Sequence, residues 1–170
     1  MKIPLDYICL KSGVLCPRCR RLVEEGKVGE HEVEVMKVLI DLEEKDPEFK
    51  FLRDAVYVKT YTSNGFHVLV LKIPEDIPPT TLIRLSRVLS DRLNAKVRVV
   101  KQTNDMKYMI AQIVAPARVQ GVNSLWLPDG TVQHIVRIPR YDARLLPTTI
   151  ENIEKILKEM FGENIRVKLS

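Results

Sequence analysis

The chain has 170 residues, of which 45% are hydrophobic and 29% charged, an ordinary balance for a globular protein. Its net charge of +5 at pH 7 permits a nucleic-acid partner. No stretch reaches the roughly 20 apolar residues of a membrane-spanning helix, and the N-terminal residues lack the apolar block of a signal peptide. The composition therefore excludes a membrane enzyme and a secreted disulfide scaffold, and we expect a cytoplasmic protein with no membrane partner.

Two segments of the chain show the same order of predicted elements: helix, strand, strand, helix, strand. Alternating apolar residues predict the strands, and apolar residues at helical spacing predict the helices. The first copy is expected at residues 33–42, 55–60, 66–73, 80–93 and 96–101. The second copy is expected at residues 106–115, 119–127, 132–138, 148–161 and 164–169.

The two copies also share residues at matching positions. The hairpin turns Asn64-Gly65 and Asp129-Gly130 lie 65 residues apart, and Thr80-Thr81 matches Thr148-Thr149 at a spacing of 68. Val97-Arg98-Val99 recurs as Ile165-Arg166-Val167. We therefore predict an α+β fold of two tandem α-β-β-α-β units, at residues 29–102 and 103–170, behind a cysteine-containing segment at residues 1–28. The threonine pairs are expected to cap the helices that follow them.

This duplicated order of elements resembles the type II KH fold, and the pair resembles the tandem KH domains of archaeal NusA-like proteins. The segment Ala115-Pro116-Ala117-Arg118, after a helix, is similar to the start of the second KH unit in those proteins. The resemblance implies a protein without enzymatic activity that acts with the transcription or translation machinery. Its partners would then be RNA, either ribosomal RNA or a nascent transcript, and the ribosome or RNA polymerase.

Both units depart from the KH pattern at the loop that holds RNA. KH domains clamp nucleotides with the backbone of a Gly-x-x-Gly loop. At the corresponding positions this chain has Ile77-Pro78-Pro79-Thr80-Thr81 and Leu146-Pro147-Thr148-Thr149. These loops contain no glycine, and proline lacks the backbone N–H that such a clamp needs. Any RNA contact must therefore come from other residues.

Basic side chains gather in both units, while the first predicted helix is acidic. Phosphate-neutralising side chains dominate nucleic-acid affinity. The candidate RNA-binding residues are Arg84, Arg87, Arg98, Lys101, Arg118, Arg137, Arg140 and Arg144. Two interpretations stay open: an RNA-binding surface, or a solvated surface on a protein-interaction adaptor of the ribosome or RNA polymerase that has lost RNA binding.

Trp126 is the only tryptophan, and it aligns with Tyr61 of the first unit. Such aromatic residues could stack on bases. We expect the pair to pack against the neighbouring unit instead, since large aromatic side chains commonly serve cores and interfaces.

The three cysteines all fall in the first twenty residues, and Cys16-Pro17-Arg18-Cys19 has the spacing of a zinc knuckle. Since a structural zinc site needs four ligands, the candidate set is Cys9, Cys16, Cys19 and His31, holding one structural zinc ion. The alternative is a group of reduced, partly buried thiols. No nucleophile elbow, phosphate-binding loop or paired-histidine helix motif is present, so we expect no catalytic residues.

Overall fold

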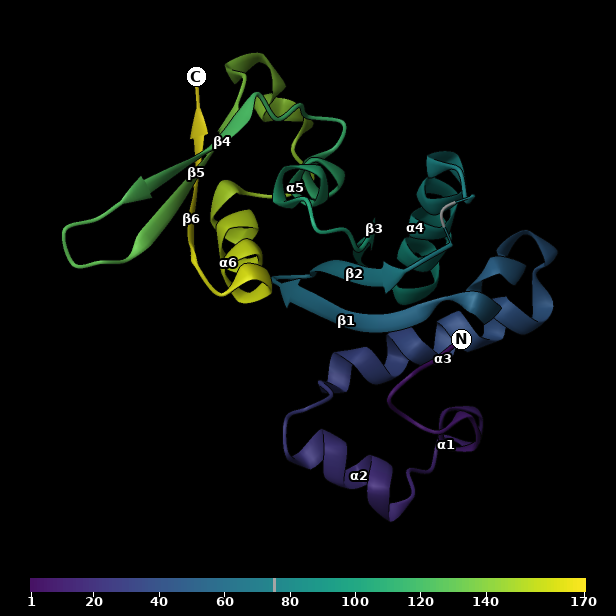
Figure 1. Ribbon diagram of the computed structural model, residues 1–170. Helices are drawn as coiled ribbons and strands as arrows, with labels where there is room; N and C mark the ends of the chain where they lie inside the picture. Colours follow the sequence, from purple (N-terminus) through teal and green to yellow (C-terminus); the bar gives the residue numbers. More distant parts are fainter. Residues whose placement is uncertain (75) are drawn as a thin grey trace.

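The structure is a computed structural model that describes residues 1–74 and 76–170, and it shows an α+β fold (Figure 1). The predicted tandem α-β-β-α-β units are confirmed. The first unit consists of α3 (Glu30–Lys45), β1 (Val56–Ser63), β2 (Phe66–Lys72), α4 (Pro79–Leu93) and β3 (Lys96–Lys101). The second consists of α5 (Met106–Val114), β4 (Gly121–Trp126), β5 (Val132–Ile138), α6 (Ile150–Phe161) and β6 (Asn164–Leu169). Two short 3-10 helices, η1 (Pro47–Asp54) and η2 (Arg140–Leu145), were not foreseen from the sequence.

The two units build sheets of the same topology. Sheet A has the order β1-β2-β3 and sheet B the order β4-β5-β6. In each sheet the first two strands form an antiparallel hairpin, and the third strand runs parallel to the second. In the first hairpin turn Asn64 and Gly65 have φ values of 47° and 80°, the left-handed conformation that favours an Asn-Gly turn.

The expected threonine caps hold for one helix only. Thr149 is the N-cap of α6, where its Oγ1 accepts a hydrogen bond from the Asn152 backbone N–H at 3.3 Å. The prediction for the first unit is wrong, because the N-cap of α4 is Pro78 and Thr80 lies inside the helix. Pro79, the first residue of α4, has no backbone N–H that would need a capping partner. The helix therefore begins without a side-chain cap.

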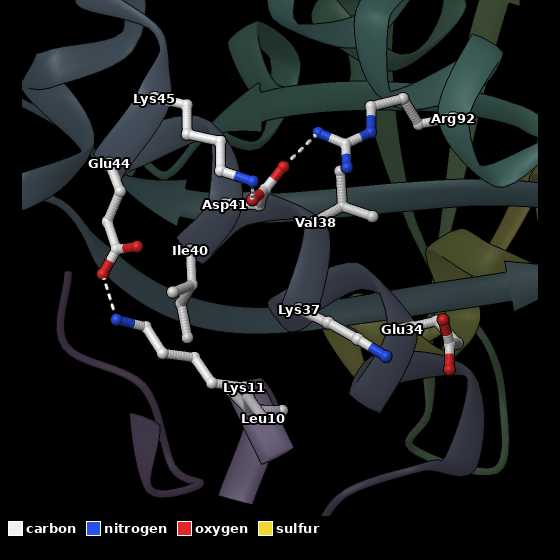
Figure 2. A pocket seen from close by; sticks show the side chains of 10 residues that line it. All are labelled: Leu10, Lys11, Glu34, Lys37, Val38, Ile40, Asp41, Glu44, Lys45 and Arg92. Carbon is white, nitrogen blue, oxygen red and sulfur yellow. Dashed lines mark ion pairs between the residues drawn. The ribbon is translucent and has the colours of Figure 1, made fainter. Parts of the chain in front are cut away.

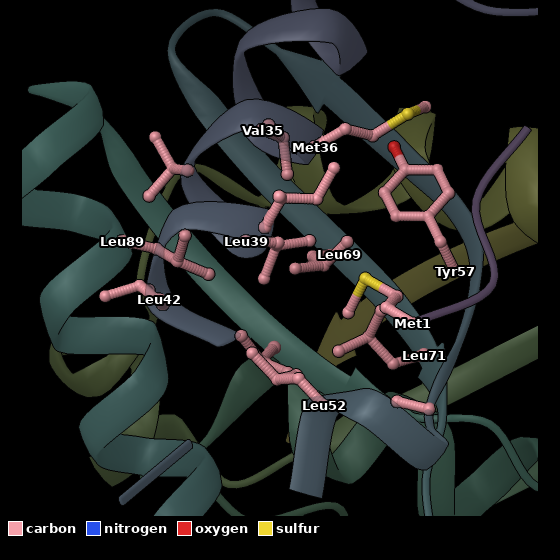
Figure 3. Close-up of a cluster of buried hydrophobic side chains, with 14 of the residues drawn as sticks. Met1, Val35, Met36, Leu39, Leu42, Leu52, Tyr57, Leu69, Leu71 and Leu89 are labelled. Carbon is pink, nitrogen blue, oxygen red and sulfur yellow. The ribbon is translucent and has the colours of Figure 1, made fainter. Parts of the chain in front are cut away.

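The larger core lies on one face of sheet A, beneath α3 and α4 (Figure 3). Alternating residues of the sheet point toward these helices, which is the period-two pattern of a strand. Leu69 and Leu71 of β2 meet Leu39 of α3 and Leu89 of α4, and all four are fully buried.

The second core lies on the opposite face of sheet A and joins the two units. Phe66, Val68 and Val70 of β2 and Val100 of β3 are buried against α5 and α6, and these helices also cover one face of sheet B. The turn after β1 adds polar contacts, since Ser63 Oγ and Asn64 Nδ2 donate to Asn152 Oδ1 of α6 at 3.0 and 2.9 Å. Helices of the second unit therefore lie between the two sheets (Figure 1).

The N-terminal segment forms two helices, α1 (Tyr7–Ser12) and α2 (Pro17–Glu24), which lie beside α3 (Figure 1). Lys2 extends sheet A through a parallel bridge to Val56, and Leu5 and Leu10 are buried in the larger core. In the part of the chain that the structure describes, no helix has both the length and the apolar character needed to cross a membrane.

Candidate metal centre and nucleic-acid groove

The three cysteines meet at one point in the N-terminal segment. Cys9, Cys16 and Cys19 place their Sγ atoms, together with a carboxylate oxygen of Asp6, within 4.8 Å of one another. Zinc binds thiolates at about 2.3 Å and carboxylate oxygens at about 2.0–2.2 Å, so ligand atoms in a tetrahedral site lie about 3–4 Å apart. The group could therefore bind a metal ion.

The local backbone explains why these side chains converge. Asp6 is the N-cap of α1 and Cys16 is the N-cap of α2, so both helix starts face the same point. Each thiol accepts a backbone hydrogen bond. The Cys16 N–H donates to Cys9 Sγ at 3.3 Å, the Asp6 N–H to Cys19 Sγ at 3.3 Å, and the Cys19 N–H to Cys16 Sγ at 3.5 Å. Amide donors favour the thiolate over the thiol, which is the form that binds metals.

The charges around the cluster differ from group to group. Arg18 Nη2 donates to Asp6 Oδ1 at 2.6 Å and lowers the pKa of that carboxyl. The Cys19 backbone N–H lowers the pKa of Cys16. Burial raises the pKa of Cys19 to about 11. A bound cation would deprotonate this last thiol, because a metal ion is the strongest local charge in such a site.

His31 lies elsewhere, so the fourth group beside the thiols is Asp6 and not the histidine expected from the sequence. His31 belongs to α3, where its Nε2 is 2.9 Å from the carbonyl oxygen of Thr60 in β1. Its ring stacks on that of His67 in β2, with centroids 6.1 Å apart. The helix that carries His31 packs on sheet A, which holds the ring against β1 and β2 and away from the cysteines.

A surface pocket of about 520 Å³ between α1, α3 and α4 is lined by charged residues that pair with each other (Figure 2). Lys11 of α1 pairs with Glu44 of α3, and Asp41 of α3 pairs with both Lys45 and Arg92. These pairs join three helices, and two carboxylates compensate most of the charge of the three cations. The pocket therefore has the character of a structural junction.

The structure divides the predicted RNA-binding residues into paired and unpaired groups. Arg84 pairs with Glu48. Arg118 donates to Asp142 Oδ2 through its backbone N–H at 2.9 Å and its Nε at 3.0 Å, and this lowers the pKa of the Asp142 carboxyl. Among the described residues, no carboxylate lies within ion-pair distance of the others, which are Arg87, Arg98, Lys101, Arg137, Arg140 and Arg144.

Two of the unpaired cations, Arg98 and Lys101, line a groove of about 530 Å³ between α4, β3 and α5. The sequence did not foresee this groove, because α5 belongs to the second unit and reaches β3 only through the packing of the units. Apolar side chains make up most of its walls, and Ile83 of α4 and Tyr108 of α5 are 55% and 47% exposed. The complete lining is Ile77, Pro79, Leu82, Ile83, Ser86, Arg98, Val99, Lys101, Tyr108, Gln112, Ala115 and Pro116.

The backbone of β3 at the edge of sheet A is already occupied by side chains. Ser90 and Ser86 of α4 accept hydrogen bonds from the backbone N–H groups of Val97 and Val99, at 3.0 and 2.9 Å. Gln112 of α5 accepts from the Lys101 N–H at 2.9 Å and donates to the Lys101 carbonyl at 3.1 Å. An edge protected in this way cannot pair with an added strand. A ligand of the groove must therefore bind through side chains.

The distinctive charge of the groove is that of Arg98, which is partly buried and has no carboxylate partner among the described residues. The side chain is half-buried, and this desolvation lowers its pKa. A desolvated charge costs free energy unless a counter-charge compensates it. The groove thus offers an unpaired cation to an anionic ligand.

Trp126 does not pack against the neighbouring unit as expected from the sequence. It lies at the end of β4, where 75% of its surface is exposed, whereas the aligned Tyr61 packs against the second core. The β4–β5 hairpin extends past α6, so its end has no neighbour among the described elements (Figure 1).

Comparisons with known proteins add little to this geometry. No protein-family model matches the chain, and no curated protein matches it significantly. Among solved structures, the chain is similar to the one described as the crystal structure of APE1850. The match has 14% sequence identity and a TM-score of 0.49, and it covers 71% of this chain and 93% of that chain.

Proposed function

We propose that this protein is a non-enzymatic RNA-associated protein and that the groove between α4, β3 and α5 binds a short single-stranded segment of RNA. The observation that carries the proposal is the half-buried Arg98, which has no carboxylate partner in the described part of the chain. A phosphate beside Arg98 and Lys101 would supply the missing counter-charge. The exposed ring of Tyr108 and the side chain of Ile83 offer apolar surfaces to unstacked bases.

The groove supports this function without a Gly-x-x-Gly loop. Its proposed anion contacts come from side chains of β3, and Ile77 and Pro79 of the loop that replaces Gly-x-x-Gly in the first unit line one end of it. With few donors aimed at base edges, binding should select weakly among sequences. By the resemblance to NusA-like proteins, we also propose that the RNA is ribosomal RNA or a nascent transcript, and that the protein acts in the cytoplasm with the ribosome or RNA polymerase.

Arg98→Gln tests the proposal, with Arg53→Gln as the matched control on the exposed surface of η1. Binding of a fluorescent single-stranded RNA is measured by anisotropy across a range of salt concentrations. We expect Arg98→Gln to lower the affinity about tenfold and to reduce the salt slope by about 0.7, the value for one single-strand phosphate. Unchanged binding by Arg98→Gln at every salt concentration would contradict the proposal.

The adaptor interpretation has one observation in its favour. Arg84 and Arg118, two of the predicted RNA contacts, are paired with Glu48 and Asp142. Arginines whose charge is already compensated by a carboxylate suit the docking of a protein partner better than phosphate binding. Capture of ribosomes or RNA polymerase that survives ribonuclease treatment, by a protein that binds no purified RNA, would favour the adaptor.

We also propose that Cys9, Cys16, Cys19 and Asp6 hold one structural zinc ion. Support comes from the closed set of four groups within 4.8 Å and from the amide donors to each sulfur. Four protein ligands leave no open position for water, which is the arrangement of structural rather than catalytic zinc. Bound zinc would tie α1 to α2 and fix the segment against α3.

Elemental analysis of untagged protein tests the zinc site. We expect about one zinc per chain in the parent and in His31→Ala, and a clear loss in Cys16→Ser and Asp6→Ala. Zinc retained by Asp6→Ala and lost by His31→Ala would return the fourth position to the histidine.

A further inference from the structure

Sheet B has one face that no described element covers. On its other face, Val136 and Ile138 of β5 and Ile165 of β6 are buried against α5 and α6. Neighbours in register share a face, so the intervening residues of the three strands make up the uncovered side. We call this surface the open face. It consists of Gly121, Asn123 and Leu125 of β4, Gln133, Ile135 and Arg137 of β5, and Asn164, Arg166 and Lys168 of β6.

Comparison of the two units shows what the open face is not built to bind. The matching face of sheet A is covered by α5 and α6, and Val68 and Val100 are completely buried there. The repeat aligns Val68 with Gln133 and Val100 with Lys168. The positions that pack against helices in sheet A thus carry polar or charged side chains in sheet B. A further helical unit, from this chain or from a second copy, would strand Lys168 in an apolar interface.

The charges on the open face have one sign. It carries Arg137, Arg166 and Lys168, and no Asp or Glu occupies any of its positions. Arg137 and Lys168 are register neighbours on adjacent strands, about 4.8 Å apart along the hydrogen-bonding direction. Arg166 makes only a 3.7 Å pair with Glu154 and stays 70% exposed. Three cations on one surface favour a polyanion.

The side chain of Arg137 reaches from β5 across to the neighbouring strand β4. At Gly121 an added Cβ would lie 3.5 Å from Nη2 of Arg137, so the guanidinium lies close over this glycine. At the end of the hairpin, Leu125 of this face is 48% exposed. A basic sheet face with an exposed leucine at one end offers phosphate contacts and an apolar surface against which a base can pack.

We propose that the open face is a second RNA-binding surface, which holds the backbone of a single strand on Arg137, Arg166 and Lys168 and packs a base against Leu125. This inference rests on the proposed function of the groove and extends it to a longer RNA. The contacts reach phosphates and one base face. This surface should therefore raise the affinity for longer strands without selecting particular sequences.

Two RNA lengths separate the open face from the groove. One labelled single strand has about 6 nucleotides, near what one KH-sized site holds, and the other about 25 nucleotides, enough for several sites. The test variant is Arg137→Gln/Arg166→Gln/Lys168→Gln. The matched control, Lys37→Gln/Lys50→Gln/Arg53→Gln, removes the same charge from exposed positions of α3 and η1. Thermal unfolding checks that all variants are folded.

We expect the test variant to bind the long strand at least about tenfold more weakly than the control, with a salt slope lower by about 2, or 0.7 for each of three phosphates. Its affinity for the short strand should equal that of the control. Leu125→Ala, at the apolar end of the open face, should weaken long-strand binding without changing the salt slope.

Each other outcome decides between the proposals. Equal long-strand binding by the test and control variants, with Arg98→Gln impaired, overturns the open face and leaves the groove. Impaired long-strand binding by the test variant, with Arg98→Gln unaffected, supports the open face as the sole RNA surface and overturns the groove. A parent that binds neither strand overturns both. Binding of poly-glutamate as tight as that of RNA overturns the open face in favour of an acidic protein partner.

Discussion

Arg98 of β3 and Arg166 of β6 occupy equivalent positions in the two units, yet Arg98 is half-buried in the groove and Arg166 is 70% exposed on the open face. The difference arises from α5 and α6, which cover sheet A and leave the matching side of sheet B uncovered. The same arginine of the repeat therefore lies in two different electrostatic environments, because the second unit covers sheet A and no described unit covers the matching face of sheet B.

Replacing Arg98 by methionine should stabilise the protein when RNA is absent. The half-buried guanidinium lacks a carboxylate among the described residues, and a methionine of similar length removes the desolvation cost. We expect the free energy of unfolding in urea to rise by about 1 kcal/mol, while the affinity for RNA falls. Arg166→Met, at the exposed equivalent position, should change stability by less than about 0.5 kcal/mol. A loss of stability in Arg98→Met would contradict the cost assigned to this charge.

Replacing Glu32 by alanine should destabilise the first unit. This buried carboxylate accepts hydrogen bonds from the Tyr57 hydroxyl at 2.5 Å, the Thr60 N–H at 3.2 Å and the Gly29 N–H at 3.0 Å. Its removal leaves these donors unsatisfied, at a cost of about 3 kcal/mol in the free energy of unfolding. Glu34→Ala, on the exposed face of the same helix, is the control. Similar unfolding midpoints for the two variants would argue against the buried network.

Removal of zinc should loosen the N-terminal helices before the rest of the protein. Chelation would take away the proposed zinc ion between α1 and α2, while both cores of the units keep their contacts. We expect a chelator to speed proteolysis between residues 5 and 28 severalfold and to make Cys16 and Cys19 reactive to a thiol reagent. Added zinc should reverse both effects. Thiols that react equally fast with and without chelator would show that no metal protects them.

Stability should fall as the pH is lowered below neutral, in part through His67. Burial and the neighbouring His31 lower the pKa of His67 below its ordinary value of 6.5. A lowered pKa in the folded state means that the unfolded chain takes up the proton first. The contribution of this group is therefore complete above pH 6.5 and is lost as the pH falls toward the folded-state pKa. Urea unfolding at pH 7.5 and 5.5 should show a smaller difference in His67→Phe than in the parent, and an equal difference would contradict the assignment.

The cost of shortening a side chain should differ between equivalent positions of the two sheets. Val68→Ala removes apolar atoms from the core between the units, and we expect the free energy of unfolding to fall by about 2 kcal/mol. Gln133→Ala, at the aligned position on the open face, should change it by less than about 0.5 kcal/mol. Equal costs would mean that the open face is covered in solution.

The sequence by itself determined the helices and strands of the two repeated units and their duplication. Asn64-Gly65 and Asp129-Gly130 specify their hairpins through local backbone preferences, and apolar periodicity specifies the helices of each unit. It also singled out Cys16 and Cys19, because knuckle spacing is a local property of the chain, and suggested Cys9 as a third ligand. The sequence also showed where the basic residues lie, but it could not show which of them form ion pairs.

Only the tertiary structure decided which groups meet. It placed Asp6 rather than His31 at the thiols, because α3 packs on sheet A and holds His31 against Thr60. It buried Arg98, exposed Trp126 and paired Arg118 with Asp142, through contacts between segments far apart in sequence. The reason is geometric: hydrogen bonding and side-chain periodicity act within a few residues, whereas the side on which one unit stacks on the next depends on the packing of whole faces.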